Sequence, residues 1–328
     1  MKKVLVFKSL YVLFIYLLLE NNNETIFLTS STVEENILNK LKNKIVIKEF
    51  NYSYNYLISK IQQYFFIQKI RRNKKILQLI LNKNIRFYGQ DNILLGNLCL
   101  NNEFYLIEEG SMNYSFFSKK NSKLKKWIRK YILNQKEIMG QSDVVKKIYL
   151  TGLAPIPEEI KDKVEIINLK ELWDKKIEEE KKEILDIFGF NNLIIERLKN
   201  KKEILYTQPL SEDAVITEEE KIGIYTKVIK NYKKETLVIK QHPREKTDYK
   251  KIFPNIEILN QSFPAELFSL LDIKFEKAIT LFSTAVLSNK NIEVDFYGTE
   301  VHPKILKRFG QMNNIMQTNA FIKEENDE

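Results

Sequence analysis

The amino-acid sequence predicts an α/β protein of two doubly wound, Rossmann-like domains that face one another across a central cleft. Short β-branched runs alternate with helical patterns over nearly the whole chain, and such alternation builds parallel sheets covered by helices. The alternation stops over residues 169–200, which are charged and helical, and then starts again. With 328 residues, the chain is long enough for two ordinary domains. We place them at residues 1–170 and 171–328, the second including the connector.

The first series of elements begins with a strand at residues 4–7 and a helix at residues 10–20. Met1-Lys2-Lys3 followed by an apolar run is also typical of a signal peptide. However, Lys8 interrupts the run, and no small-residue cleavage site follows it. The uninterrupted apolar part is too short to span a bilayer. We therefore expect a buried strand and helix, and neither a signal peptide nor a membrane span.

Strands and helices continue to alternate in both halves of the chain. In the first half we expect strands at residues 45–47, 85–88, 104–107, 147–150 and 164–167, and helices at 54–81 and 123–134. In the second half we expect strands at 204–206, 236–239, 255–259, 278–282 and 292–296. A capping box from Thr217 to Glu220 opens a helix to residue 232. Further helices are expected from Pro264, after residue 282 and at 304–316, and only the acidic tail, 324–328, is expected to be disordered.

The composition points to an anionic partner and a reducing compartment. Lysine and arginine outnumber the acids by 53 to 43, which gives a net charge of +10 and favours anionic partners. Basic clusters at residues 69–75 and 119–126 face anionic lipid, nucleic acid or only water. The single cysteine, Cys99, excludes an intramolecular disulfide, and no Cys/His cluster has zinc-site spacing. A cytoplasmic location fits this composition best.

Two histidines are the strongest candidates for chemistry, because the chain contains no others. In doubly wound sheets, ligands bind beyond the carboxyl ends of strands. His242 lies in Lys240-Gln241-His242-Pro243-Arg244, directly after the strand at 236–239, where it can donate a proton to a phosphate or neutralise one. The alternative is a strand-end histidine held by local hydrogen bonds. His302 also precedes a proline, but there the proline starts a helix, which explains the residue structurally.

Carboxylates and hydroxyls follow other predicted strands. Glu109, within Glu108-Glu109-Gly110, and Asp213 are placed to deprotonate a hydroxyl, or else are ordinary turn residues. Ser283 and Thr284, at a strand-to-helix junction, make either an anion site or a plain helix cap. Glu266, in the first turn of a helix, either stabilises the helix dipole or accepts hydrogen bonds from a ribose.

Several common motifs are absent from the sequence. There is no Gly-x-Gly-x-x-Gly and no phosphate-binding P-loop among the nine glycines, which argues against dinucleotide and NTPase sites. No Asp-x-Asp pair occurs, so we expect no metal-dependent nucleotide-sugar site and no bound metal. His-Glu-x-x-His and Gly-x-Ser-x-Gly are absent as well.

The ordered set of motifs resembles that of bacterial lipooligosaccharide sialyltransferases of glycosyltransferase family 52. The likeness covers residues 87–91 (Phe-Tyr-Gly-Gln-Asp), 106–110, 206–213 and 240–245 (Lys-Gln-His-Pro-Arg-Glu), and then Ser283-Thr284. Each motif is short, but their order extends over nearly the whole chain. The resemblance implies a GT-B architecture, a CMP-sialic acid donor, and metal-independent, inverting transfer to a terminal galactose-type hydroxyl of a glycolipid, without a cofactor.

The resemblance also implies a role for each candidate residue. His242 would act on the departing CMP phosphate, Ser283 and Thr284 would form the hydroxyl pair at that phosphate, and Glu266 would hold the cytidine. Two residues match a catalytic base. Glu109 matches through the Glu-Glu-Gly motif of a related family, although many relatives carry Asp where this chain has Glu-Glu. Asp213 matches as an aspartate upstream of the His-Pro motif, and we favour Asp213.

Two other functions remain open on the sequence alone. The first is a different GT-B transferase, for example of capsule assembly, that uses another nucleotide donor. The second is a basic nucleic-acid or membrane-surface binder, but the sequence contains no RNA- or DNA-reading motif, so we expect no nucleic-acid partner. For a transferase we expect a glycolipid or oligosaccharide acceptor, peripheral contact with the inner face of the inner membrane, and a homodimer.

Overall fold

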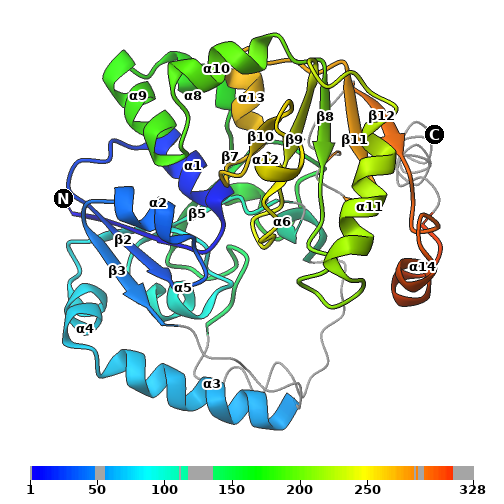
Figure 1. Ribbon diagram of the computed structural model, residues 1–328. Coiled ribbons are helices and arrows are strands. Elements are labelled where there is room, and N and C mark those ends of the chain that lie inside the picture. The colour runs from blue at the N-terminus through cyan, green and yellow to red at the C-terminus, as the bar shows by residue number, and fades with distance from the viewer. Residues whose placement is uncertain are drawn as a thin grey trace. The chain divides into compact units, whose positions relative to one another are not determined.

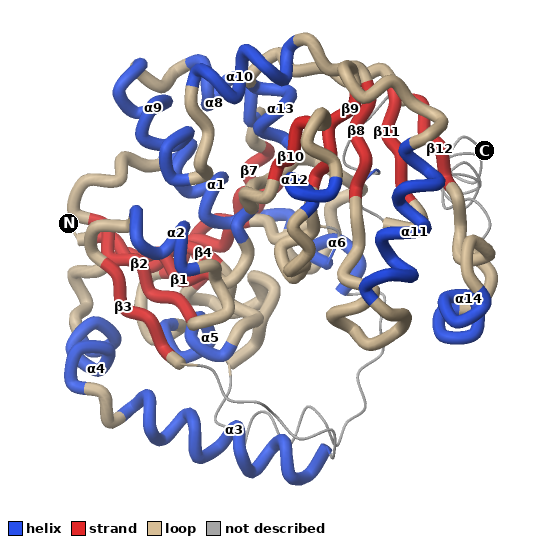
Figure 2. Tube along the Cα trace, in the orientation of Figure 1, coloured by secondary structure: helices blue, strands red, loops and turns tan. Residues whose placement is uncertain are grey.

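The chain folds into two compact units, residues 1–187 and 188–328 (Figure 1). The computed structural model describes residues 2–48, 56–110, 112–116, 136–283, 286 and 292–312. Each unit is built around one parallel β-sheet with helices packed against it. Figure 2 shows the strands of each sheet side by side. The chain therefore has the predicted α/β class with two parallel sheets.

Unit 1 contains a seven-stranded sheet in the order β3-β2-β1-β4-β5-β6-β7. Its strands are β1 (Lys3–Phe7), β2 (Thr25–Ser30), β3 (Lys44–Ile47), β4 (Arg86–Gly89), β5 (Phe104–Ile107), β6 (Val145–Leu150) and β7 (Val164–Ile166). Its helices are α1 (Leu10–Leu19), α2 (Glu35–Lys40), α3 (Tyr56–Arg71), α4 (Lys74–Leu81), α5 (Leu94–Cys99), α6 (Met112–Ser115), α8 (Leu169–Asp174) and α9 (Glu178–Ile187). The chain winds outward in both directions from the central pair β1 and β4, so the topological switch point lies between them.

Unit 2 repeats this plan with a five-stranded sheet in the order β10-β9-β8-β11-β12. Its strands are β8 (Glu203–Tyr206), β9 (Leu237–Lys240), β10 (Glu257–Leu259), β11 (Lys277–Thr280) and β12 (Glu293–Phe296). Its helices are α10 (Asn192–Lys199), α11 (Glu218–Ile229), α12 (Tyr249–Ile252), α13 (Glu266–Leu270) and α14 (Pro303–Phe309). The switch point of this sheet lies between β8 and β11, beside the strand that carries the His-Pro motif.

The N-terminal residues form the predicted strand and helix. The strand β1 pairs with both β2 and β4 at the centre of the sheet, and α1 is buried from Val12 to Leu18. Ser9 caps α1, because its hydroxyl accepts the backbone N–H of Tyr11. Among the residues that the structure describes, no helix is long and apolar enough to cross a bilayer.

Every strand expected from the sequence is present, with ends shifted by no more than two residues. The strand β2 was not predicted, because it begins with Thr25 and ends with Thr29 and Ser30 and so lacks a continuous apolar run. The hydroxyl of Thr25 bonds to Tyr16 and that of Thr29 donates to the Phe7 carbonyl, so both threonines are satisfied inside the core. The capping box at Thr217 and Glu220 is confirmed, with α11 ending at Ile229.

Two long helical predictions prove to be several helices. The stretch 54–81 divides into α3 and α4 at Asn73, whose side chain accepts from the backbone N–H of Lys75 and Ile76 and so caps a new helix. The stretch 169–200 divides into α8, α9 and α10, with Gly189 in the left-handed region at φ 76° between the last two. The helix expected at 123–134 and the acidic tail lie outside the described residues.

Side-chain amides join the two strands at each switch point. In unit 1, Gln90 follows β4, and its Oε1 accepts the backbone N–H of Lys8 and Ser9 after β1, at 2.8 and 3.2 Å. In unit 2, Gln208 follows β8, and its Oε1 accepts the backbone N–H of Phe282 after β11, at 3.1 Å. The carboxyl ends of the switch strands are thus tied together in both units.

Two positions next to the turn at Gln90, residues 89 and 96, have no room for a side chain and are both glycine. A Cβ at Gly89 would stand 1.9 Å from the Val6 carbonyl oxygen, and a Cβ at Gly96 would stand 1.7 Å from the Gln90 carbonyl oxygen. Both neighbours are backbone atoms of sheet-bound segments, so neither can swing aside. Helix α5 can approach the sheet this closely only through a glycine.

We predict that Gly96→Ala lowers the free energy of unfolding by about 2 kcal/mol or more, the upper range for overpacking a core. Gly223→Ala in α11 is the matched control, because a Cβ there meets nothing within 4 Å. That substitution should raise the free energy of unfolding by up to about 1 kcal/mol through helix propensity. Urea unfolding followed by circular dichroism measures both. Equal effects of the two substitutions would contradict the close approach at Gly96.

Candidate active site

The His-Pro motif lies at the carboxyl edge of the second sheet. The strand β9 ends at Lys240, and His242 follows it in a turn closed by a hydrogen bond from the backbone N–H of Glu245 to the His242 carbonyl. The Nδ1 atom of His242 accepts the backbone N–H of Arg244 at 3.1 Å. A neutral ring that accepts at Nδ1 carries its proton on Nε2. The half-buried imidazole therefore has Nε2–H as its remaining donor.

The surroundings keep this histidine neutral. Burial is the largest cause that lowers the pKa of His242, and the positive charges of Arg244 and Lys240 lower it further. Asp213 and Glu212 act in the opposite direction and do not outweigh these effects. Near neutral pH the ring is thus an uncharged hydrogen-bond donor, and it gains affinity for a proton when an anion approaches.

Glu245, the last residue of the motif, holds the histidine turn in place. Its buried carboxylate accepts the backbone N–H of His242 at 2.9 Å, the hydroxyl of Tyr249 at 2.8 Å, and the hydroxyl of Thr207 from the loop after β8. Burial raises the pKa of Glu245, although these hydrogen bonds oppose it. One carboxylate thus links the loops that follow β8 and β9.

A buried lysine on α11 completes this link. The side chain of Lys221 is fully buried, and its Nζ lies 2.9 Å from Glu212, 3.1 Å from Glu218 and 3.7 Å from Glu245. Glu212 also accepts the backbone N–H of Lys246 at 2.7 Å. Burial raises the pKa of Glu212, but the hydrogen bonds from Lys246 and Lys221 outweigh it, so the pKa is lowered overall. The ammonium group therefore sits among three carboxylates from three segments of unit 2.

Asp213 lies in the same loop, but its carboxylate is already engaged. The guanidinium of Arg244 donates to both Asp213 oxygens, at 2.5 and 3.0 Å. The pair is partly exposed, so it can open at modest cost. The structure links Asp213 to the His-Pro turn through Arg244, and opening of this ion pair would expose the carboxylate further.

The two hydroxyl residues that are predicted to bind the phosphate, Ser283 and Thr284, follow β11 in the sequence. The backbone N–H of Ser283 donates to the hydroxyl of Thr280 at 2.8 Å, next to the point where Gln208 holds Phe282. Ser283 thus stands at the switch point of the sheet. Thr284, its predicted partner, lies outside the described residues.

Glu266 opens α13, as expected from its place in the sequence. The loop that precedes this helix carries Phe263, which packs edge-to-face on Phe190 and Phe268, with ring centroids 4.6 and 5.1 Å away. The Lys240 ammonium lies 4.9 Å from the Phe263 ring centroid. A cation–π contact of this kind connects the end of β9 to the loop before Glu266.

In unit 1 the two adjacent glutamates after β5 have different surroundings. Glu108 is buried and accepts from the hydroxyl of Tyr114 at 2.9 Å and from the backbone N–H and hydroxyl of Thr151, so it anchors the loop after β6. Glu109 is half-buried, and its carboxylate accepts from the Asn92 amide at 2.8 Å. Of the two, Glu109 is the carboxylate that a substrate can reach.

Asp91, in the Phe-Tyr-Gly-Gln-Asp motif, is a structural acid. It is fully buried and accepts the backbone N–H of Met139 and Gly140, both at 2.8 Å. Burial raises its pKa to about 6, although these hydrogen bonds oppose it. The motif therefore fixes the segment around residue 140 to the end of β4 and leaves no free carboxylate.

His302 has the structural role predicted for it. Its Nδ1 accepts the backbone N–H of Lys304 at 3.2 Å, and Pro303 occupies the first turn of α14. The other nitrogen lies 3.6 Å from Glu220. The residue is a helix cap that lies beside Glu220 of α11.

Neither the burial of Lys221 nor the role of Glu245 is evident from the sequence pattern. Glu245 carried a weak signal, because it belongs to the ordered His-Pro-Arg-Glu motif. Lys221 carried none, since lysine in a charged helix is normally solvated. Within the described residues, no group of three His, Cys, Asp or Glu side chains is arranged to hold a metal ion.

Comparison with known proteins identifies the family. The model of "Glycosyltransferase family 52" matches residues 14–305. An uncharacterized protein of Haemophilus influenzae is 44% identical over 253 residues, which cover 75% of this chain and 81% of that protein.

Solved structures share the fold at low sequence identity. The α-2,3-sialyltransferase of Photobacterium phosphoreum has a TM-score of 0.55 at 15% identity and matches 90% of this chain and 89% of its own. The GT-B domain of a Photobacterium damselae sialyltransferase has a TM-score of 0.53 at 12% identity, over 90% of each chain. A Photobacterium 2,6-sialyltransferase bound to CMP and lactose has a TM-score of 0.55 at 11% identity, over 90% of this chain and 71% of that one.

These matches cover both units and agree with the two doubly wound sheets. The fold is GT-B, and the chain is a glycosyltransferase that belongs to glycosyltransferase family 52.

Proposed function

We propose that this enzyme is a sialyltransferase that moves sialic acid from CMP-sialic acid to a terminal galactose-type hydroxyl of a lipooligosaccharide or related surface glycan. The observation that carries the proposal is the neutral His242 with its Nε2–H donor, in a turn fixed beside the switch point of unit 2. The GT-B neighbours named above are sialyltransferases, and one of them was solved with CMP and lactose. Family membership and site chemistry support the same reaction.

The chemistry of this transfer matches the groups in unit 2. When CMP leaves, the sugar becomes oxocarbenium-like and negative charge develops on the phosphate. The Nε2–H group of His242 and the hydroxyl of Ser283 are donors suited to that charge. Because His242 is neutral beforehand, it costs less to desolvate than an imidazolium and becomes more basic as the phosphate gains charge.

The acceptor hydroxyl requires a base. We propose Asp213 for this role, with Glu109 as the alternative. Release of Asp213 from Arg244 would free its carboxylate to accept the proton, and would free the guanidinium to meet an anion. Among the described residues, the Asn92 amide is the hydrogen-bond donor to the Glu109 carboxylate, and no ion pair with a described residue would have to open first. Inversion at the anomeric carbon follows from direct attack by the deprotonated hydroxyl, and no metal is needed.

The proposal is tested by measuring nucleotide release with a panel of CMP-, UDP- and GDP-sugars. We expect release of CMP from CMP-sialic acid, increased by an acceptor with terminal galactose and unchanged by EDTA. Preference for a UDP- or GDP-sugar would show that the donor is not CMP-sialic acid, and the family assignment would stay the same. Loss of activity on chelation, restored by magnesium or manganese, would refute the metal-independent site.

His242→Ala should lower kcat by about 100-fold or more, the usual scale for a group that stabilises developing charge. His302→Ala should leave kcat nearly unchanged, with a loss of about 1 kcal/mol in stability from the missing helix cap. Steady-state kinetics together with thermal unfolding separate the two effects. Equal losses of kcat in folded proteins would contradict the assignment of His242.

The two candidate bases should differ between binding and catalysis. The true base is needed for the acceptor proton but not for donor binding, so its amide variant should keep its affinity for CMP and lose transfer rate. We expect Asp213→Asn to show this pattern and Glu109→Gln a milder one, by calorimetric CMP titration and transfer kinetics.

Arg244→Gln is a control for the ion pair, since it releases Asp213 without removing the carboxylate. Full transfer by Asp213→Asn, beside an inactive but folded Glu109→Gln, would assign the base to Glu109.

A further inference from the structure

The helices α3 and α4 of unit 1 have an inner face that belongs to the core and an outer face that does not. Phe66 and Ile70 of α3, and Ile76 and Ile80 of α4, are buried in the hydrophobic core of unit 1. On the outer face, large apolar side chains are exposed: Phe65 at 66%, Ile61 at 57%, Tyr64 at 40%, Leu81 at 66% and Leu77 at 38%. Each helix is therefore apolar on two sides, and packing among the described residues of unit 1 explains only the inner side.

Basic side chains accompany these exposed apolar residues. Lys69, Arg72, Lys74 and Lys75 are all exposed and lie in the last turn of α3, the junction and the first turn of α4. We call the nine residues together the α3–α4 surface. No aspartate or glutamate occurs anywhere from residue 50 to residue 90. The surface thus combines protruding apolar groups with positive charge that no nearby acid in the sequence offsets.

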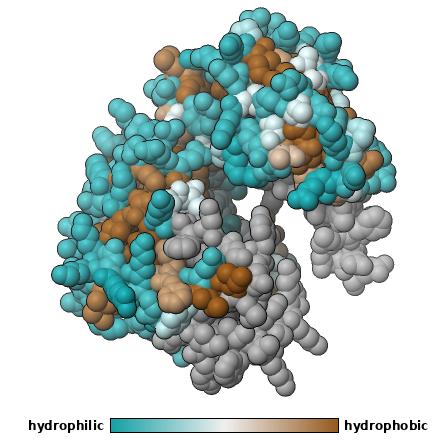
Figure 3. Space-filling view, turned by 60° about the horizontal axis from the view of Figure 1, so that its bottom comes forward, coloured by the Kyte–Doolittle hydropathy of each residue, from teal (hydrophilic) through white to brown (hydrophobic). Residues whose placement is uncertain are grey.

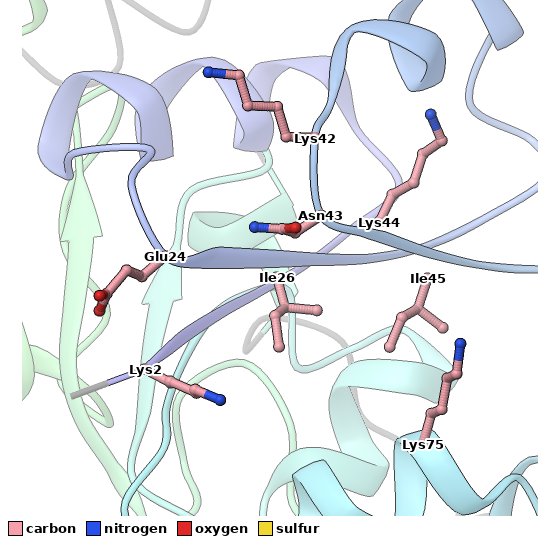
Figure 4. Close-up of a pocket in the computed structure, with 8 residues that line it drawn as sticks. All are labelled: Lys2, Glu24, Ile26, Lys42, Asn43, Lys44, Ile45 and Lys75. Atoms are coloured by element: carbon pink, nitrogen blue, oxygen red, sulfur yellow. The ribbon is translucent and has the colours of Figure 1, made fainter.

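A lysine-lined groove adjoins the start of α4. Its volume is about 560 Å³, and it is lined by Lys2, Glu24, Ile26, Lys42, Asn43, Lys44, Ile45 and Lys75. In Figure 4 the side chains of Lys2 and Lys75 lie on the same side as Ile26 and Ile45, whereas Lys42 and Lys44 project to the other side. The ammonium group of Lys44 donates to the Leu38 carbonyl, and the Nζ atom of Lys42 lies 3.9 Å from a carboxylate oxygen of Glu183. Among the described residues, neither Lys2 nor Lys75 has an ion-pair partner.

We propose that the α3–α4 surface binds an anionic phospholipid membrane, with the adjoining groove receiving headgroup phosphates at Lys2 and Lys75. An exposed helix face that carries large apolar side chains with lysine or arginine beside them can insert into the membrane interface. Each basic group near an anionic surface adds to the attraction. In Figure 1 α3 lies at the lower edge of unit 1, and Figure 3, which brings that side forward, shows brown hydrophobic atoms at the surface among hydrophilic ones.

Charge and apolar exposure together favour a lipid surface over the other candidate partners. A nucleic acid would use the lysines and arginines and could stack a base on Phe65, but exposed aliphatic side chains such as Ile61 and Leu81 offer it neither charge nor a stacking surface. Membrane binding requires no donor or acceptor sugar, so the inference does not depend on the proposed transfer reaction. For a transferase acting on a glycolipid, it would place unit 1 at the surface that holds the acceptor.

The inference is tested by co-sedimentation of the full chain with phospholipid vesicles. We expect binding to phosphatidylcholine vesicles that contain about one third phosphatidylglycerol, and little binding to phosphatidylcholine alone. Binding should weaken as NaCl rises from about 0.05 to about 0.5 M. Binding of single-stranded RNA without vesicle binding, or equal binding to neutral and anionic vesicles, would overturn the proposal.

Substitutions locate the binding surface. Ile61→Ser with Phe65→Ser, and separately Arg72→Glu with Lys75→Glu, should each weaken vesicle affinity by about ten-fold or more. The matched controls lie in unit 2: Leu193→Ser, whose side chain is 69% exposed on α10, and Lys234→Glu, which is exposed after α11.

Both controls should bind vesicles normally, and all variants should unfold at the same temperature as the unsubstituted chain. A loss as large in the controls as in the α3–α4 variants would refute the assignment of this surface.

Discussion

The fully buried ammonium group of Lys221 is the interaction on which the candidate site depends. It joins Glu212 from the loop after β8, Glu218 from its own helix and Glu245 from the His-Pro turn. Removing one partner from a buried ion pair typically costs about 3–5 kcal/mol, because the remaining charges stay desolvated. Here the loss would leave three carboxylates facing one another. The loops that carry Asp213 and His242 therefore hold their shape as one unit.

This arrangement holds a small set of candidate residues in place in a chain that has no glycine-rich phosphate-binding motif. Glu245 fixes the backbone of His242, and the backbone of Arg244 fixes its tautomer. Among the described residues, the hydrogen bonds that hold the imidazole and its backbone come from Arg244 and Glu245, both within the motif. Pre-arranged donors of this kind need no reorganisation when charge develops beside them, so the role proposed for His242 would benefit from the rigidity of the buried cluster.

The sequence predicted the architecture well because hydrophobic periodicity reports burial. Strands such as β9 are apolar on both faces and flanked by turn residues, which makes them easy to recognise. The same criterion missed β2, whose threonines are satisfied by Tyr16 and the Phe7 carbonyl. It also missed Lys221, because only tertiary contacts distinguish a buried lysine from a solvated one. Glu108 and Glu109 are adjacent and chemically identical, and only the partners Tyr114 and Thr151 show that one of them is structural.

The glutamine ties at the two switch points have a consequence for how substrates are selected. In many nucleotide-binding sheets a glycine-rich turn at this position wraps the phosphate with backbone N–H groups. Here Gln90 accepts the N–H groups of Lys8 and Ser9 after β1, and on the other side of the switch point in unit 2 Gln208 accepts the N–H group of Phe282 after β11. Because these backbone N–H groups already have hydrogen-bond acceptors, side chains would have to recognise a nucleotide at these positions. A preference for one nucleotide over another can then be altered by exchanging single side chains, without rebuilding a loop.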